Sequence, residues 1–483
     1  MKKEDEKNVN GVEETQVAES AAEPVAEENA VGAETAVSAE TESAAVRSDE
    51  ANGEAKEEDF FSPKEPSKKK KRIRRKDMTP EQRRVRRIKD IIITCSVFGV
   101  VLLFFAICAI CSYAGYNGNF KYIASLGKID YDSPYTPTFD KDLGYTVFTT
   151  DTDEDFRVLQ LTDVHIGAGA FSAAKDRWAL DAVRTVIDKT KPDLVIVTGD
   201  IAYPVPFQAG TFNNMREAEM FASLMEELGV YWTMTFGNHD TEIYSLYDRD
   251  QIGDFYENEK WTYCLFNKGP EDLPGCGNDM ILVKNKEGKI IQSFVMLDSH
   301  SYVEGSMLGI SWNYDNIKKS QTDWYASEID RLTAVNADAG YENPEVKNCV
   351  FFHIPLTEYG EYWSAYRAGA DNVKKLFGKA GEDGEKSYPG QAGCETFETM
   401  AAHYGQGAFC GHDHYNTYSL EITLESGKKI RLTYGMSIDY LAYIGIAGHI
   451  EQRGGTEIKI NHVTGDMTLR QQPYQGAKAG NFV

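Results

Sequence analysis

The chain has 483 residues and a formal net charge of −24. Its length allows about two to four domains, and its acidic balance disfavours nucleic-acid polymers as partners, because phosphate backbones attract basic surfaces. The eight cysteines include no CxxC pair and no regular spacing, which argues against a disulfide framework or a zinc ribbon.

Residues 1–67 are predicted to be a disordered acidic tail. The first sixty residues carry eighteen acidic and five basic side chains and almost no aromatic ones. Such a segment buries too little apolar surface to offset the chain entropy lost on folding. Residues 68–90 form a basic segment with a positive net charge, since thirteen basic and two acidic side chains lie between Lys68 and Lys89.

Residues 91–112 form an uncharged apolar run that predicts a transmembrane helix. The alternative, a buried core helix, is rare at this length without charge. The basic segment lies directly before the run, so the positive-inside rule places the tail in the cytoplasm and the larger C-terminal part outside it. We therefore expect a single-pass protein of the cell membrane. Nothing in the tail identifies a cytoplasmic partner.

The remaining chain is predicted to be a stalk with a lead-in strand, 113–155, followed by one large domain, 156–483. Short apolar runs in that domain alternate with segments of helical periodicity, which is typical of an α/β fold with a mixed sheet. The expected strands are 157–161, 193–197, 230–236, 291–297, 348–352 and 407–410, with a hairpin at 418–424 and 429–434. The expected helices are 173–190, 215–228 and 316–332.

Asp, Asn and His side chains, which can bind metal ions, follow five of these strands. Ligands of open α/β sheets bind beyond the carboxyl ends of strands, so these side chains are expected to lie at one rim. A single histidine at a strand end is usually a structural residue, but five strand ends that each carry a metal-type ligand predict a metal site. The set comprises Asp163, His165, Asp200, Asn238, His239, His353, His412 and His414.

This mixture of carboxylate and imidazole suits a pair of metal ions, with Mn, Fe or Zn as candidates. Two cations about 3.5–4 Å apart can stabilise the negative charge that develops during phosphate ester hydrolysis. Because such cations repel each other, an anionic ligand has to lie between them, and Asp200 is the natural choice. In Asp163-x-His165 and His412-x-His414, extended backbone points both side chains the same way.

The blocks LTDVH, TGDIAY, FGNHD, FFHIP and CGHDH resemble, in this order, the pattern of the calcineurin-like metallophosphoesterase family. The resemblance covers roughly residues 156–434. It implies a four-layer α-β-β-α sandwich with two mixed β-sheets. The protein-phosphatase signature GDxVDRG is absent, because Asp200 is followed by IAYP. The FFHIPLTEY block is most similar to a branch loosely related to purple acid phosphatases.

The resemblance also implies a role for each residue. One metal ion would be held by Asp163, His165, Asp200 and His414, and the other by Asp200, Asn238, His353 and His412. His239 would stand beside the phosphate and either protonate the leaving oxygen or stabilise the transition state, and Asp240 would orient His239 through a hydrogen bond. Tyr203 stands where purple acid phosphatases carry a tyrosinate ligand, but with His165 present it is expected to line the pocket wall.

Three functions remain open at this level. The favoured one is metal-dependent hydrolysis of a small phosphorylated substrate by an extracytoplasmic, membrane-anchored domain. The second is a nucleotide pyrophosphatase or phosphodiesterase that uses the same site. The third is a catalytically silent binding protein with this fold.

Overall fold

The computed structural model describes residues 74–303, 313–382, 384–443, 452–475 and 478–483. The predicted acidic tail lies outside the described residues, as does the start of the basic segment. The chain separates into two units, Met1–Met78 and Thr79–Val483. In the first unit the described part contains a short 3-10 helix, Arg75–Asp77. The second unit contains all the other helices and strands.

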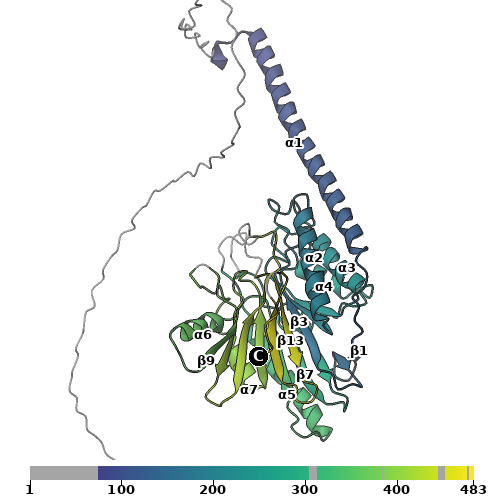
Figure 1. Ribbon diagram of the computed structural model, residues 1–483. Helices are drawn as coiled ribbons and strands as arrows, with labels where there is room; N and C mark the ends of the chain where they lie inside the picture. The colour runs from purple at the N-terminus through teal and green to yellow at the C-terminus, as the bar shows by residue number, and fades with distance from the viewer. Residues whose placement is uncertain (1–73, 304–312, 383, 444–451, 476–477) are drawn as a thin grey trace, which may run out of the picture. The chain divides into compact units, whose positions relative to one another are not determined.

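A sheet of five strands has the order β14-β13-β3-β4-β5 (Figure 1). Strands β3, β4 and β5 run parallel, and β13 is antiparallel to both β3 and β14. Two helices, α2 and α3, follow β3 and β4 along the chain. The bounds are β3 Phe156–Leu161, α2 Ala173–Thr190, β4 Leu194–Thr198, α3 Asn214–Leu228, β5 Trp232–Thr235, β13 Gly454–Ile460 and β14 Met467–Pro473.

A second, mixed sheet of nine strands has the order β1-β2-β6-β7-β8-β10-β12-β11-β9. Strands β7, β8, β10 and β12 run parallel in its centre. The bounds are β1 Thr136–Asp140, β2 Tyr145–Thr149, β6 Asp279–Lys284, β7 Ile290–Met296, β8 Lys347–Phe351, β9 Val373–Phe377, β10 Gly405–Cys410, β11 Ser419–Thr423 and β12 Lys429–Tyr434.

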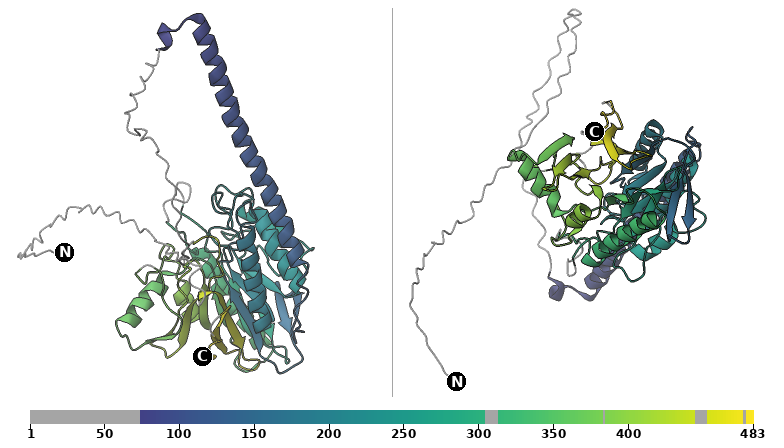
Figure 2. Two further views of the ribbon diagram at one scale, coloured as in Figure 1. Left: turned by 45° about the horizontal axis from the view of Figure 1, so that its top comes forward. Right: turned by 90° about the horizontal axis from the view of Figure 1, so that it is seen from below.

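Helices cover the outer faces of both sheets, as the views in Figures 1 and 2 show. On the five-stranded sheet they are α2, α3 and α4, Arg249–Tyr256, which share one apolar cluster with the sheet. On the nine-stranded sheet they are α5, Lys319–Asp338, α6, Thr357–Arg367, and α7, Thr396–Ala402. A third apolar cluster fills the space between the sheets. The predicted four-layer α-β-β-α sandwich is therefore confirmed.

Strand β3 shows how the sequence pattern builds these layers. Its side chains alternate between two faces because the strand period is two residues. Phe156 and Val158 belong to the cluster between the sheets, whereas Leu159 and Leu161 belong to the cluster beneath the helices. Both faces are buried, so the strand is apolar almost throughout. It ends directly before the segment that carries Asp163 and His165.

One helix, α1, Pro80–Ile123, is long and apolar enough among the described residues to cross a membrane. It begins at a capping box in which the Thr79 hydroxyl accepts from the Gln82 backbone N–H and the Gln82 side chain accepts from the Thr79 N–H. The apolar run is exposed rather than buried in the domain. This exposure argues against the alternative of a buried core helix.

The structure differs from the predicted stalk over residues 113–155. The segment 113–123 continues α1, and its aromatic side chains pack against the cluster of α2 and α3. Residues 136–149 form β1 and β2, which pair with each other and join the nine-stranded sheet through β6. The high content of Gly, Asp and Pro concealed these two short strands, whose burial depends on a distant partner.

Glu217 on α3 generates a prediction about stability. It is fully buried, and burial, together with the carboxylates of Asp176 and Asp240, raises its pKa well above the usual value. In the unfolded chain the group ionises near about pH 4.3, so its ionisation opposes folding increasingly as the pH rises above that value. We expect Glu217→Gln to stabilise the protein more at about pH 8 than at about pH 5.

Thermal unfolding of the full-length chain in detergent at both pH values measures this effect. The difference in unfolding free energy between variant and wild type should grow by up to about 1.4 kcal/mol per pH unit between the two pKa values. A difference that stays constant with pH would show that Glu217 is ionised in the folded protein.

Candidate metal centre

The side chains predicted after the strands converge at one edge of the sandwich. Parallel strands bring their carboxyl ends to the same edge, and the loops that follow β3 and β4 lie side by side. The backbone N–H of Asp163 donates to Gly199 O (3.1 Å) and that of His165 to Asp200 O (3.0 Å). Strands β3, β4, β5, β8 and β10 lead respectively to Asp163 with His165, Asp200, Asn238 with His239, His353, and His412 with His414.

Four of these residues form a compact buried group. Ligand atoms of Asp163, His165, Asp200 and His414 all lie within 4.8 Å of one another. His165 Nε2 is 3.2 Å from Asp200 Oδ2, and His414 Nε2 is 3.4 Å from Asp163 Oδ1. The group is the same set of four that the resemblance implied for one metal ion.

The other predicted ligands adjoin this group through Asp200. His353 Nε2 lies 3.1 Å from Asp200 Oδ2 and 3.1 Å from Asn238 Oδ1. His412 Nδ1 lies 3.0 Å from the same Asn238 oxygen. Asp200 Oδ2 thus lies between His165 and His353, while Asp200 Oδ1 accepts the backbone N–H of His239 at 2.8 Å.

These separations fit metal ligation. Two ligand atoms that are each about 2.1 Å from one ion lie roughly 3.0–3.4 Å apart in octahedral or tetrahedral geometry. The contacts between predicted ligands span 3.0–3.4 Å. The donors are carboxylate and amide oxygens and imidazole nitrogens, a set that suits Zn, Fe or Mn. The residues therefore fit a pair of metal ions.

The backbone is strained at four of the predicted ligands. Asp163, His165, Asp200 and His412 have φ values of 50°, 51°, 55° and 74°, a left-handed region that non-glycine residues rarely adopt. Such strain persists where surrounding contacts enforce it, and it concentrates at functional sites. The prediction of extended backbone in Asp163-x-His165 and His412-x-His414 is therefore wrong.

The glycines before the ligands act in two ways. Gly199 has a φ of 83° and turns the backbone. Gly237 instead makes room, because a Cβ atom there would lie 2.1 Å from Asp200 Oδ1.

Buried charges of opposite sign balance each other in the site. Burial alone would raise the pKa of Asp200, but His353 and His239 outweigh it and lower that pKa well below its usual value. Burial would likewise lower the pKa of His353, yet Asp200 raises it to about 9. Protons on His165 and His353, whose pKa values the neighbouring carboxylates raise, supply positive charge beside Asp200. A bound metal ion would replace these protons, so metal binding should release protons.

His239 faces the opening of the site, with a quarter of its side chain exposed. Its Nδ1 lies 2.7 Å from Glu242 Oε1, so Glu242 orients the ring, and the prediction that Asp240 does so is wrong. The buried Asp240 carboxylate accepts backbone N–H groups of Asp200, Ala202 and Gly237 at 2.8–3.0 Å. The Asp240 carboxylate points toward the loops, where it satisfies these buried N–H groups. Its bond to the Asp200 backbone fixes the position of Asp200.

Asp439 was missed by sequence reasoning. Its Oδ2 lies 3.0 Å from His414 Nδ1, and its Oδ1 lies 3.6 Å from His165 Nδ1. The carboxylate also accepts three backbone N–H groups, from Leu441, Ala442 and Tyr443. Carboxylates in this position fix the ring orientation of ligating histidines. The sequence feature that could have identified Asp439 is its position five residues after β12, the second strand of the predicted hairpin.

Aromatic rings form the walls of the site. Tyr203 stacks on His165 with 4.7 Å between ring centroids, and its hydroxyl donates to Gln208 Oε1 at 2.7 Å. This arrangement agrees with the pocket-wall interpretation of Tyr203. Tyr314 packs edge-on against His412 at 4.2 Å, and Tyr302 donates to Glu242 at 3.2 Å.

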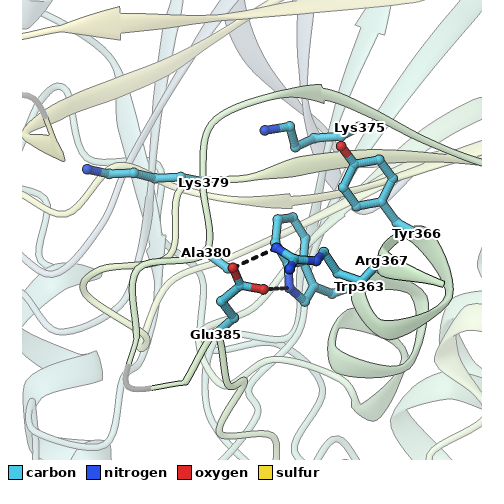
Figure 3. Close-up of a pocket in the computed structure, with 7 residues that line it drawn as sticks. All are labelled: Trp363, Tyr366, Arg367, Lys375, Lys379, Ala380 and Glu385. Carbon is cyan, nitrogen blue, oxygen red and sulfur yellow. Dashed lines mark hydrogen bonds and ion pairs between the residues drawn. The ribbon is translucent and has the colours of Figure 1, made fainter. Parts of the chain in front are cut away.

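A separate hollow of about 450 Å³ lies between α6 and the strand β9 at the edge of the large sheet (Figure 3). In it the Glu385 carboxylate accepts from Arg367 Nη1 (2.7 Å) and from Trp363 Nε1 (3.3 Å). None of its lining residues belongs to the predicted ligand set, so it is distinct from the candidate metal centre.

The chain is similar in sequence to known phosphoesterases. Residues 156–416 match the family described as calcineurin-like phosphoesterase. The chain is 25% identical over 330 residues to a protein of Arabidopsis thaliana named probable inactive purple acid phosphatase 14, which covers 62% of this chain and 75% of that protein. It is 28% identical over 332 residues to phosphatase DCR2 of Saccharomyces cerevisiae, covering 64% of this chain and about half, 51%, of the yeast protein.

Two solved structures share weak overall similarity with the chain, each at 12% sequence identity. One is a dimetal phosphatase from Danio rerio, with a TM-score of 0.39 and coverage of 68% of this chain and 98% of that one. The other is the purple acid phosphatase PPD1 from yellow lupin (Lupinus luteus) seeds, with a TM-score of 0.37 and coverage of 69% and 55%.

The contacts of Asp439 generate a second prediction. We expect Asp439→Asn to lower metal affinity by about 10- to 100-fold, because His165 and His414 lose the charge that orients their rings. Titration of the metal-depleted full-length chain with Mn or Zn measures this affinity. As a control, Asp155→Asn alters another Asp–His pair, with His462 (2.9 Å), at the opposite end of β3, and should leave the affinity unchanged. Equal affinity in both variants would mean that Asp439 holds only the backbone.

Proposed function

The chain belongs to the calcineurin-like phosphoesterase family, and from this we propose that it hydrolyses phosphate esters at a centre of two metal ions. The observation that carries the proposal is the position of Asp200. Its Oδ2 lies 3.2 Å from a histidine of one ligand group and 3.1 Å from a histidine of the other. An anionic oxygen between two cation sites is what a closely spaced metal pair requires.

The proposed ligand sets follow the two groups of side chains. One ion is held by Asp163, His165, Asp200 and His414, and the other by Asp200, Asn238, His353 and His412. The ions, of which Mn, Fe and Zn are the candidates, supply positive charge that stabilises the phosphoryl oxygens and lowers the pKa of a water molecule. All of the ligand residues are buried, and this burial strengthens every charge interaction in the site.

His239 is the proposed general acid. Its Nδ1 is held by Glu242, so in the protonated ring Nε2 carries a second proton that can pass to the leaving oxygen of the ester. The backbone N–H of His239 binds Asp200 Oδ1, which ties the position of the acid to that of the metal ligands. Glu242 takes the positioning role that was predicted for Asp240.

The name of the Arabidopsis relative, probable inactive purple acid phosphatase 14, favours a second candidate function, a catalytically silent binding protein. The intact ligand set and the positioned His239 support the enzyme instead. A third alternative, a nucleotide pyrophosphatase or phosphodiesterase, would use the same residues. Turnover of aryl phosphates, lipid phosphates and nucleotides by one preparation separates these three functions.

We also propose that residues 91–112 of α1 span the cell membrane. The exposure of this apolar run and the basic residues 68–90 before it support a cytoplasmic N-terminus and an extracytoplasmic catalytic domain, 156–483. The proposed tail, 1–67, stays on the cytoplasmic side. In place of a stalk, the last turns of α1 connect the span directly to the domain.

The role of His239 gives a third prediction. We expect His239→Ala to lower kcat for an aryl phosphate by about 10²- to 10⁴-fold, with unchanged metal content, because His239 lies outside both ligand sets. Steady-state kinetics and metal analysis of the same detergent-solubilised preparations measure this. His462→Ala, which removes a histidine paired with Asp155, should keep full activity. Loss of metal together with activity would instead make His239 part of the metal site.

Metal removal gives a fourth prediction. Dialysis against a chelator should reduce turnover to the background rate, and Mn, Fe or Zn should restore it. Asp200→Asn should prevent restoration, because one neutral amide oxygen cannot bridge two cations. A metal-free preparation that retains turnover would exclude the proposed centre, whereas a metal-loaded protein that turns over no phosphate ester would favour the silent binding protein.

A further inference from the structure

The last turns of α1 run beside α3 in the same direction. Ser112, at the end of the apolar run, accepts a hydrogen bond from Arg216 in the first turn of α3 (3.4 Å). At the other end, the backbone N–H of Ile129, just beyond α1, donates to Leu228 O at the end of α3 (3.0 Å). The last turns of α1 therefore lie parallel to α3. The apolar run leaves the domain at the N-terminal end of α3.

The same holds along α2. Asn119 Nδ2 donates to the carbonyl of Ala173, the first residue of α2 (3.1 Å), and the Tyr122 hydroxyl donates to Asp181, about two turns further along α2 (2.9 Å). Helices α2 and α3 each follow a strand whose carboxyl end carries metal-type ligands. Their N-terminal ends therefore lie at the ligand edge of the sandwich, and α1 joins the domain at that edge.

Exposed apolar side chains gather on the loops of this edge. We call Phe171, Phe207, Phe212, Ile243 and Leu246 the rim patch; they are 48–94% exposed. Their loops are joined by hydrogen bonds from Phe171 N to Ala209 O (3.0 Å) and from Leu246 N to Phe212 O (2.9 Å). The three loops that carry the patch are therefore linked to one another, although they come from separate segments of the chain.

The rim patch borders the candidate metal centre. Ile243 directly follows Glu242, which holds His239. The Phe171 ring packs against Gly210, two residues after Gln208, which binds the Tyr203 hydroxyl. A surface that contacts this patch therefore reaches the opening of the site.

A group of exposed apolar side chains around a site is typical of a surface that contacts a partner or a membrane. We infer that the rim patch rests on the membrane surface, and that the substrate is a phosphate monoester carried by a membrane lipid. This inference depends on the phosphoesterase activity and the span proposed above. The bilayer is the favoured occupant because the apolar run ends at Ser112, beside the first turn of α3.

The reaction on this substrate is a hydrolysis. The P–O bond to the lipid alcohol breaks, a P–O bond to the oxygen of water forms, and His239 gives a proton to the lipid oxygen. One proton of the water stays on the phosphate, the other passes to solvent, and His239 takes up a proton from solvent again. The products are inorganic phosphate and the lipid alcohol, and no oxidant or further reactant is needed. The alcohol stays in the bilayer while the phosphate leaves into solution.

Photo-crosslinking tests the membrane contact without reference to activity. The full-length chain, reconstituted in phosphatidylcholine vesicles, carries p-benzoylphenylalanine in place of Phe207 or, as a control, in place of Val463. Val463 is 62% exposed and follows β13 at the end that pairs with Phe156, which is the edge opposite the ligands. We expect crosslinks to lipid from position 207 at least about five-fold above position 463. Equal labelling would overturn the membrane contact.

Kinetics test the substrate class. In vesicles that contain phosphatidic acid, Phe171→Ser with Phe207→Ser should reduce the release of phosphate from this lipid at least about ten-fold, while turnover of a soluble aryl phosphate changes less than two-fold. Val463→Ser should change neither rate. Wild-type protein that cleaves the aryl phosphate but not the lipid phosphate would overturn the substrate assignment. Crosslinking at position 207 without any turnover would leave the membrane contact in place and exclude the phosphoesterase.

Discussion

The separation between the two sheets is the constraint on which the ligand edge depends. Asp200 follows a strand of the five-stranded sheet and His353 a strand of the nine-stranded sheet, yet their ligand atoms lie 3.1 Å apart. The buried layer between the sheets sets this distance, for example where Phe156 stacks on Phe294 at 5.8 Å. Because packed interiors transmit rather than absorb volume changes, a substitution in that layer moves one half of the ligand set against the other.

Carboxylates outside the ligand set maintain the unusual backbone of the site. Asp240 binds N–H groups of the loops after β4 and β5, and Asp439 binds three N–H groups together with His414. These bonds offset the strain of ligands held at positive φ. A loss of either carboxylate would leave buried donors unpaired, which costs about 1–3 kcal/mol each.

The sequence predicted the fold where the signal was local. The buried, mainly apolar strands β3 and β4 and the amphipathic helix α2 were predicted within a residue or two of their observed bounds. Apolar runs identify such strands, and the helical spacing of apolar residues identifies such helices. For residues 113–155 the sequence predicted a stalk with one lead-in strand, but not the pair β1 and β2, since their apolar faces are short and their partner β6 lies far along the chain. The contact of α1 with α2 and α3 was likewise invisible, because polar contacts such as Asn119 to Ala173 have no local pattern.

At the site, the sequence by itself determined which residues follow strand ends and which of them are metal-type ligands, because both properties depend on neighbours in the chain. It also identified Asp200 as the residue to expect between two cations. Only the tertiary structure decided that Glu242 rather than Asp240 orients His239, and that Asp439 reaches His165 and His414. Such pairings depend on distances between loops that no local pattern encodes, since they are set by how the two sheets pack and how each loop closes.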